Sequence, residues 1–392
     1  MTDDVKVDEL SPDLAQCLKL GKDTLTIDPY KMKVINKIIN CRTVKSGRHH
    51  YICDDCDYEL ELYNSCGNRH CNRCQTFLKD KWILKKKEDL LPVDYFHMVF
   101  TMPVQLRSLI YSNQKLLYSL MFKVVKETLL ELSKESKFLG AKIGVIATLH
   151  TWGQQLNYHP HLHCIIPNGG LSLDHKSWID GKKNFFLPIQ VMSELFKGKF
   201  LAYLIEYYKS KKLCFYGKSS IYEEESKFKK LTYKLRQKKW VVYAKSCDGN
   251  PRYALDYLGN YTHRVAISNS RILSIKDEMI TIKYKDYKDE ESKQKVFTKE
   301  SFIKNFLMHI LPKGFQKTRT YGFLSNPSRK KQVGQIKKLL KIEQTKVIPQ
   351  ETAESLLDLY DIDVTCCPKC KSKNYNRVSF SVARSPPIKK DN

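Results

Sequence analysis

Three histidines stand close together in the stretch HPHLH at positions 159–163. Alternate side chains of a β-strand share one face, so His161 and His163 would point the same way while Leu162 enters the core. Imidazoles held on a rigid strand can bind one divalent metal ion together. A His-x-His pair also arises by chance, so an ordinary strand is the alternative for this pattern taken alone.

Two neighbouring residues could complete such a metal site. His159 shares the parity of His161 if the strand continues through Pro160, which makes it a reserve ligand. Gln154 precedes His161 by seven residues, on the partner strand of an expected hairpin, and could supply an oxygen ligand. The alternative for Gln154 is an ordinary turn residue.

Tyr257 and Tyr261 are four residues apart in the stretch YLGNYTHRV. On a helix this spacing places both rings on one face. A tyrosine hydroxyl can attack phosphorus, yet paired tyrosines at this spacing are more often part of a core. His263 and Arg264 follow in the same stretch, and such polar and cationic residues are unusual on the buried face of a helix. A guanidinium suits phosphate, so Arg264 is a candidate DNA-binding residue.

Cysteines and histidines cluster between residues 41 and 74, where aliphatic residues are few. Two Cys-x2-Cys pairs have a spacing close to that of four-cysteine zinc sites. The candidate ligands are Cys41, His49, Cys53, Cys56, Cys66, His70, Cys71 and Cys74. They outnumber the four ligands of a tetrahedral ion, so we expect one or two structural Zn²⁺ ions. A buried thiol pair or a redox motif is the alternative for either pair alone.

A weaker cysteine group stands far along the sequence, in the stretch CCPKC of Cys366, Cys367 and Cys370. It supplies only half of a zinc ligand set. The spacing leaves two possibilities open, namely a further ion bound with outside ligands and an inert group of thiols.

Lysine and arginine number 68 against 42 acidic residues, a formal net charge of +26 in 392 residues. This excess favours a polyanionic partner, because each cation that replaces a counterion on phosphate adds affinity. A basic protein without such a partner is the alternative. The clustered thiols and the acidic, polar first segment favour a reducing, cytoplasmic location. If the polyanionic partner is DNA, the protein is expected to be nucleoid-associated when bound to it. No stretch of the sequence is apolar enough to span a membrane.

Hydrophobic periodicity indicates the elements that carry these residues. The first half is expected to hold two short helices before residue 40, a basic helix at 79–91, a strand at 95–103, a long helix at 104–138 and an antiparallel hairpin of 142–152 with 159–167. The second half is expected to hold helices at 189–211, 219–238, 251–263 and 302–311, a strand at 240–244 and a β-rich stretch at 271–287.

Strands interleaved with helices predict an α+β fold. We expect a helical and zinc-binding module at 1–91 and a catalytic domain at 92–325. Residues 326–392 are expected to form helices, the CCPKC knuckle and a basic tail.

Taken together, the motifs resemble those of the two-tyrosine HUH (His-hydrophobic-His) transposases of the insertion sequence 91 family. The matching stretches include YNSCGNRHCNRCQ at 63–75, YFHMVFTMP at 95–103, HPHLHCIIPNGG at 159–170 and YLGNYTHRVAIS at 257–268. They occur in the order expected for the family. Asn72 stands where the zinc motif often has proline, and the last 60 or so residues match loosely.

This resemblance implies an HUH endonuclease-like antiparallel sheet with helices, preceded by a small zinc-binding domain. It implies that His161 and His163 bind Mg²⁺ or Mn²⁺ and that Tyr257 and Tyr261 are nucleophiles. The expected function is that of a DNA transposase, which nicks and rejoins single-stranded DNA through 5′-phosphotyrosine intermediates in rolling-circle transposition of an insertion sequence. The expected partner is DNA, especially the single-stranded or hairpin ends of the mobile element.

Two other functions fit some of the same residues. A replication initiator or relaxase would share the HUH chemistry, but the zinc module before the HUH domain favours a transposase. A non-catalytic zinc-dependent DNA-binding regulator would leave the histidine and tyrosine pairs as ordinary core residues.

Overall fold

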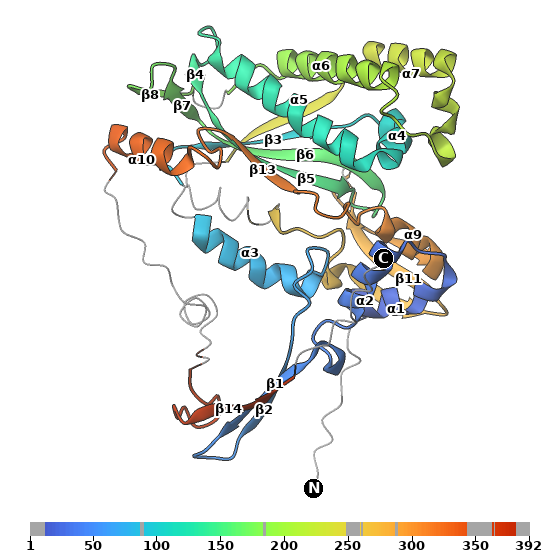
Figure 1. Ribbon diagram of the computed structural model, residues 1–392, viewed down its shortest axis with the longest axis vertical. Helices are drawn as coiled ribbons and strands as arrows, with labels where there is room; N and C mark the ends of the chain where they lie inside the picture. Colours follow the sequence, from blue (N-terminus) through green and yellow to red (C-terminus); the bar gives the residue numbers. More distant parts are fainter. Residues whose placement is uncertain are drawn as a thin grey trace, which may run out of the picture. The chain divides into compact units, whose positions relative to one another are not determined.

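The computed structural model describes residues 12–86, 90–182, 186–247, 259, 262–286, 289–342, 363 and 365–381 (Figure 1). Its contacts divide the chain into two compact units. Unit 1 comprises residues 1–82, 263–310 and 347–392, and unit 2 comprises residues 83–262 and 311–346. Each unit is assembled from segments far apart in the sequence. The division into three consecutive domains stays a prediction.

Unit 2 is built on a five-stranded sheet in the order β13-β5-β6-β3-β9. Its strands are β3 (Tyr95–Thr101), β5 (Gly144–Trp152), β6 (Tyr158–Pro167), β9 (Val241–Cys247) and β13 (Thr318–Gly322). Every neighbouring pair is antiparallel. The predicted hairpin is confirmed as β5 and β6, and the α+β fold with antiparallel sheets is confirmed.

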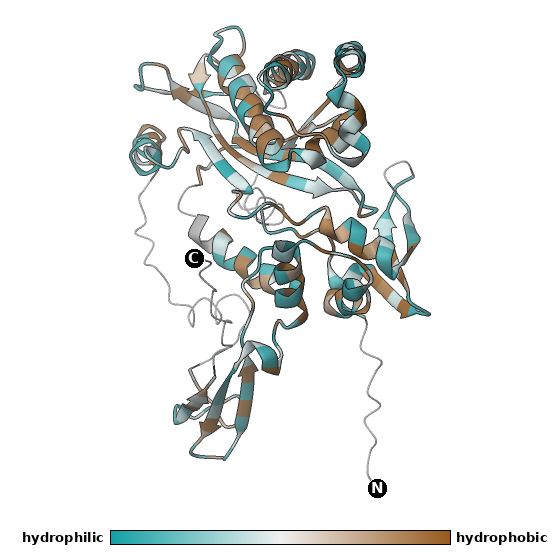
Figure 2. Cartoon of the chain, turned by 45° about the vertical axis from the view of Figure 1, so that its right-hand side comes forward, coloured by the Kyte–Doolittle hydropathy of each residue, from teal (hydrophilic) through white to brown (hydrophobic). Residues whose placement is uncertain are grey.

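Two long helices cover one face of this sheet, α5 (Gln114–Lys134) and α6 (Ile189–Lys209) (Figure 1). Phe100 of β3 packs edge-on against Phe196 of α6, with ring centroids 5.2 Å apart. On β13, the Arg319 guanidinium lies 4.4 Å from the ring centroid of Phe122 on α5. Both helices carry buried apolar residues, among them Met121 and Val125 on α5 and Phe196 and Phe200 on α6. Figure 2 shows the hydropathy of the residues along the whole chain. The other face of the sheet carries the histidines.

The long helix expected at 104–138 is divided. A 3₁₀ turn (Val104–Leu106) and α4 (Arg107–Ser112) precede α5. Asn113 stands at the break, where its side-chain amide donates to the carbonyls of Leu109 and Cys214 at 3.0 and 2.7 Å, and its Oδ1 accepts from the Cys214 N–H at 2.8 Å. These bonds tie the break to a distant segment, which local periodicity cannot reveal.

Smaller elements complete unit 2. They are β4 (Ala141–Lys142), β7 (Gly169–Ser172), β8 (Trp178–Asp180), the 3₁₀ helix η5 (Gly217–Glu223), α7 (Glu225–Gln237) and α10 (Arg329–Leu339). Gly322 ends β13 with a φ of 63°, and a Cβ there would lie 1.7 Å from the Ile143 carbonyl oxygen. The close approach of β13 to β5 therefore requires glycine at this position.

Part of unit 1 joins the first helices to a β-rich segment. Its elements are α1 (Leu14–Gly21), α2 (Pro29–Ile39), the sheet β10-β11-β12 (Ile272–Lys276, Met279–Lys285, Ser292–Thr298) and α9 (Lys299–Leu307). A Cβ on Gly21 would lie 2.6 Å from Ile303 Cγ1, so α1 and α9 are in close contact. The two early helices and the β-rich stretch are confirmed, and β12 extends beyond the expected range.

The rest of unit 1 holds a small three-stranded ribbon in the order β14-β1-β2 (Figure 1). Its strands are β1 (Arg48–Cys53), β2 (Glu59–Tyr63) and β14 (Tyr375–Phe380). Helix α3 (Asn72–Lys86) follows it and starts seven residues before the predicted basic helix. Residues 375–380 belong to the C-terminal segment expected to hold helices, the CCPKC knuckle and a basic tail, and the strand that they form pairs with β1.

Candidate metal centres

Three imidazoles converge on the face of the five-stranded sheet opposite the one that α5 and α6 cover. His161 and His163 lie on β6, and His150 lies on β5 directly opposite His161. One ring nitrogen of each histidine lies within 4.8 Å of the others. The Nε2 atoms of His161 and His163 are 3.0 Å apart. The shared face predicted for His161 and His163 is confirmed.

Hydrogen bonds at the far nitrogens orient two of these rings. His161 Nδ1 lies 2.6 Å from the carbonyl oxygen of His159, which can only accept, so Nδ1 carries the proton. His163 Nδ1 lies 2.7 Å from Nε2 of His97 on β3. Burial lowers the pKa of His97 to about 4, so this ring is neutral at pH 7 and can accept from His163. With His97 as the acceptor, the Nε2 atoms of His161 and His163 both carry lone pairs.

The donor set fits a divalent cation. With the protons of both rings on Nδ1, the two Nε2 lone pairs face one another at 3.0 Å, and a cation between them would remove their repulsion. Nitrogens bound at about 2.1 Å and at right angles around one ion would be about 3.0 Å apart. Three imidazoles also leave other coordination positions open for substrate oxygens.

His150 is the residue of this centre that the sequence motifs did not single out. It is buried, with 2% of its surface exposed, and its ring stacks on Trp152 at 4.6 Å. The usable signal was the hairpin register, which pairs His150 with His161 and Thr148 with His163. Gln154 lies in the turn between the two strands, and its role as a ligand stays a prediction.

His159, the reserve ligand, is not in the group of three. Its Nδ1 accepts from Arg107 Nη2 at 2.6 Å. Burial, and secondarily the charge of Arg107, lower the pKa of His159 to about 4. The backbone carbonyl of His159 thus orients His161, and the imidazole ring of His159 binds the Arg107 guanidinium.

The first cysteine group consists of Cys41, Cys66, Cys71 and Cys74. The sulfur of Cys74 lies 3.5 Å from that of Cys41 and 3.6 Å from that of Cys66. Sulfurs at about 2.3 Å from a tetrahedral zinc ion are about 3.8 Å apart, whereas a disulfide bond is about 2.05 Å long. The geometry therefore fits zinc and excludes a disulfide.

The second cysteine group consists of Cys53, Cys56, Cys367 and Cys370. Cys53 and Cys370 have sulfurs 3.5 Å apart, and those of Cys56 and Cys367 are 3.7 Å apart. The CCPKC stretch supplies the missing half of this set, a pairing that no local spacing signals.

His49 and His70, both predicted zinc ligands, are in neither cysteine group. The His49 ring stacks on Phe380 of β14, with centroids 6.3 Å apart. His70 donates from its backbone N–H to Asn68 Oδ1 at 2.9 Å. Eight thiolates already supply two complete sets of four, so the geometry needs no imidazole.

Comparison with known proteins identifies the family of this chain. A family described as "Putative transposase" matches residues 144–332, and a "Transposase zinc-binding domain" matches residues 14–102. The chain is 40% identical over 345 residues to a protein named "Putative transposase y4qJ" from Sinorhizobium fredii, covering 86% of each chain. This chain belongs to the insertion sequence 91 family of transposases.

A second relative supports this assignment. The transposase for insertion sequence element IS801 of Pseudomonas savastanoi pv. phaseolicola is 27% identical over 312 residues, which cover 76% of this chain and 70% of the relative. No solved structure matches the chain. As a transposase, the protein is an enzyme that cuts DNA and transfers strands. None of the helices in the described residues is long and apolar enough to cross a membrane.

The two matched regions contain different candidate metal centres. The zinc-binding domain match, residues 14–102, contains the whole first cysteine group but only Cys53 and Cys56 of the second. The match at residues 144–332 contains His150, His161 and His163. Cys367 and Cys370 lie outside both matches.

The predicted nucleophiles Tyr257 and Tyr261 lie outside the described residues. The segments around them are described. β9 ends at Cys247, and the His263 ring lies 3.0 Å from Gln75 Oε1 and edge-on to Trp82. Arg264, the predicted DNA-binding residue, is exposed. Its accessibility suits contact with a phosphate.

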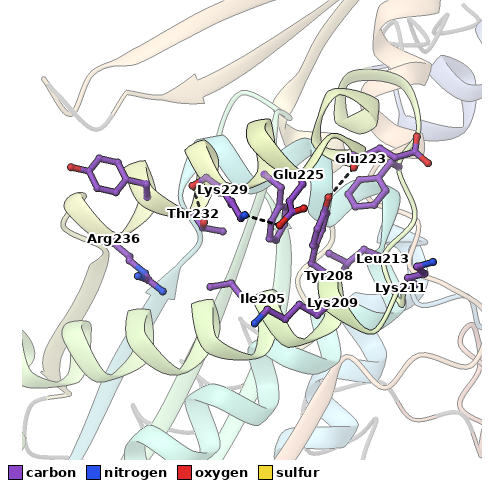
Figure 3. A pocket seen from close by; sticks show the side chains of 13 residues that line it. Ile205, Tyr208, Lys209, Lys211, Leu213, Glu223, Glu225, Lys229, Thr232 and Arg236 are labelled. Atoms are coloured by element: carbon purple, nitrogen blue, oxygen red, sulfur yellow. Dashed lines mark hydrogen bonds and ion pairs between the residues drawn. The ribbon is translucent and has the colours of Figure 1, made fainter.

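A separate cavity of about 950 Å³ lies in unit 2 (Figure 3). It is lined by Ile205, Tyr208, Lys209, Lys211, Leu213, Phe215, Glu223, Glu225, Phe228, Lys229, Thr232, Tyr233 and Arg236. Tyr208 and Phe228 stack on one another at 3.9 Å, and Lys229 forms an ion pair with Glu225 at 2.7 Å. These four residues are thus paired with one another within the cavity wall. None of the lining residues belongs to a candidate metal centre.

Proposed function

We propose that this transposase nicks and rejoins single-stranded DNA with tyrosine nucleophiles, beside a divalent ion held by His150, His161 and His163. The observation that carries the proposal is the convergence of three imidazoles, with the far nitrogens of His161 and His163 already hydrogen-bonded. A bound Mg²⁺ or Mn²⁺ would supply Lewis acidity to a phosphoryl oxygen of the scissile phosphate.

The protein's own groups fix the ligand geometry. The His159 carbonyl and the His97 ring select the tautomers of His161 and His163 and hold their orientations. Such outer hydrogen bonds typically change metal affinity or activity by about 10–100-fold when they are removed. The ion would therefore meet a preorganised site on the rigid hairpin of β5 and β6.

Tyr257 and Tyr261 are the proposed nucleophiles. A phenolic oxygen attacks phosphorus and forms a 5′-phosphotyrosine, while the bond to the 3′-oxygen of the preceding nucleotide breaks. The phenol loses one proton and the leaving 3′-oxygen takes up one proton, so the step is balanced. Because a phosphoester is exchanged for a phosphoester, a free 3′-hydroxyl can reverse the step without ATP. Two tyrosines allow a second cut while the first remains loaded, as rolling-circle transposition requires.

The connection lengths permit this arrangement. β9 ends at Cys247, level across the sheet with Pro167 of β6. Pro167 is six residues from His161, which is about 20 Å along a strand. Ten residues lead from Cys247 to Tyr257 and can span at most about 33–36 Å. A tyrosine at position 257 can therefore return to the histidines.

Single-stranded DNA is the proposed substrate, in particular the single-stranded or hairpin ends of the element. The strand register puts Tyr243 and Lys245 of β9 on the same sheet face as the histidines, and both are exposed. Aromatic rings stack on unpaired bases and lysines pair with phosphates. The zinc module with helix α3 is the proposed reader of the element's ends.

The test uses labelled single-stranded DNA from the ends of the encoding element. We expect a protein–DNA adduct that survives denaturing electrophoresis, that requires Mg²⁺ or Mn²⁺ and that is absent in chelator. Cleavage without an adduct would contradict a tyrosine nucleophile. Binding without cleavage in the presence of either ion would overturn the proposed chemistry.

A further inference from the structure

The second cysteine group is formed by two turns of the same construction. In the first turn the Asp57 N–H donates to the Cys53 carbonyl at 2.9 Å, and in the other the Lys371 N–H donates to the Cys367 carbonyl at 2.9 Å. Asp57 and Lys371 both adopt left-handed backbone, with φ of 54° and 64°. Each turn therefore presents both sulfurs of its Cys-x2-Cys pair in the same way.

The two turns contribute to one ligand set although they are far apart in the sequence. Cys56 and Cys367 are 311 residues apart, and their sulfurs are 3.7 Å apart. All four sulfurs lie within 4.8 Å of one another. This spacing matches the edge of a tetrahedron of thiolates around zinc, about 3.8 Å.

Polar contacts join the same two turns. Asp55 accepts from the Asn374 amide at 3.1 Å and from the Ser372 hydroxyl. Asp54 accepts from the Asn376 amide at 2.8 Å, and its N–H donates to the Asn374 carbonyl at 2.9 Å. Beyond the turns, β14 pairs with β1 from Tyr375 to Phe380. Two ring pairs add to these polar contacts, His49 with Phe380 and Tyr51 with Tyr375.

Apolar burial contributes little to holding β14 in place. Five of its six residues are exposed, among them Val378 at 52% and Phe380 at 62%. A small ribbon of this kind is marginally stable by itself in water. Apolar burial supplies little of the free energy that would stabilise this ribbon. An ion bound by four thiolates would supply it, because metal binding and folding are coupled.

We propose that Cys53, Cys56, Cys367 and Cys370 form a second structural zinc site, which fastens residues 365–381 to the ribbon of β1 and β2. The "Transposase zinc-binding domain" match ends at residue 102 and thus contains half of these ligands. Four thiolates leave no open coordination position, so the ion is structural and takes no part in DNA cleavage.

Metal content tests this site directly. We expect two zinc ions per wild-type chain and one per chain of the double variant Cys367→Ser/Cys370→Ser. Cys366→Ser is the matched control: this buried thiol neighbours Cys367 but is not in the group, so this variant keeps both ions. Two ions in the double variant, or loss of an ion from the control alone, would overturn the assignment.

Thiol labelling tests the site in the wild-type protein, independently of whether a variant folds. Cys370 and Cys214 are both exposed. In zinc-loaded protein we expect an alkylating reagent to modify Cys214 at once and Cys370 at least tenfold more slowly, and a chelator to abolish the difference. Equal labelling of the two thiols before chelation would overturn the proposal. This readout does not depend on DNA cleavage, so it stands apart from the function proposed above.

Discussion

His97 Nε2 lies 2.7 Å from His163 Nδ1, and both rings are buried on the same face of the central sheet. The two rings are nearly parallel, with centroids 5.0 Å apart and an interplanar angle of 14°. The contact with His97 therefore holds the His163 ring in the orientation that directs Nε2 toward His161. A residue outside the ligand set thus sets the direction of one ligand.

The first prediction concerns this pair. His97→Leu removes the acceptor and should lower cleavage by about 10–100-fold, with the loss partly recovered at high Mn²⁺ concentration. A titration of cleavage rate against Mn²⁺ checks it. His97→Gln, which restores an acceptor, should recover much of the rate. A reduced rate that no concentration of Mn²⁺ improves would assign His97 a packing role only.

The second prediction separates the candidate ligands of the histidine centre. His150→Ala, His161→Ala and His163→Ala should each abolish cleavage, because each removes a coordinating nitrogen. His159→Ala should be milder, and so should Gln154→Ala. Adduct yield and Mn²⁺ binding are the measurements. Loss of both in the Gln154 variant, with both retained in the His150 variant, would make Gln154 the third ligand.

The third prediction concerns the nucleophiles. The double variant Tyr257→Phe/Tyr261→Phe should bind DNA and form no adduct. A tyrosine that only packs loses about 1 kcal/mol of stability on this change, the net value of one hydrogen bond. Tyr243→Phe is the control: it keeps the exposed ring proposed to stack on a base and removes only the hydroxyl, so the adduct yield should not change. Wild-type adduct yield from the double variant would exclude both tyrosines.

The fourth prediction concerns the first cysteine group. Cys71→Ser should remove one zinc ion per chain and lower the thermal unfolding temperature of the protein. The reason is that Cys71 is buried and belongs to a set that a serine cannot complete. Elemental analysis with calorimetry checks both effects. Purification without chelator of a folded wild-type protein that holds no zinc would contradict the assignment.

The fifth prediction follows from the net charge of +26. The logarithm of the DNA association constant should fall linearly with the logarithm of salt concentration. With about six phosphate contacts to a single strand, the slope would be about −4. Fluorescence anisotropy across a salt series measures it. A slope near zero would mean that phosphate contacts do not dominate the interface.

The parts of the site that obey short-range rules could be predicted from the sequence. The period of a strand places His161 and His163 on one face, and the hairpin that carries them was visible as two apolar runs. His150 could not be singled out in the same way, because its place depends on which residues of β5 and β6 pair. That register becomes visible only once the turn between the strands is known.

Long-range contacts explain the remaining differences. The break at Asn113 depends on hydrogen bonds to Cys214, about one hundred residues later. Cys367 and Cys370 looked like half of a site because their partners precede them by more than three hundred residues. Strand β14, with its mostly exposed residues, carried no alternating apolar pattern. Local periodicity carries no information about such distant partners.

The split cysteine group also sets an order of assembly during synthesis. In the first group Cys41 and Cys74 are only 33 positions apart, so this group can take up zinc early. Cys56 cannot complete its ligand set until Cys367, 311 residues later, has been synthesised. At about 5–20 residues per second, that wait lasts about 15–60 s. Throughout this interval Cys53 and Cys56 are an incomplete pair, open to oxidation or to competing metals. Filling of the second site therefore marks a chain that has been translated through Cys370.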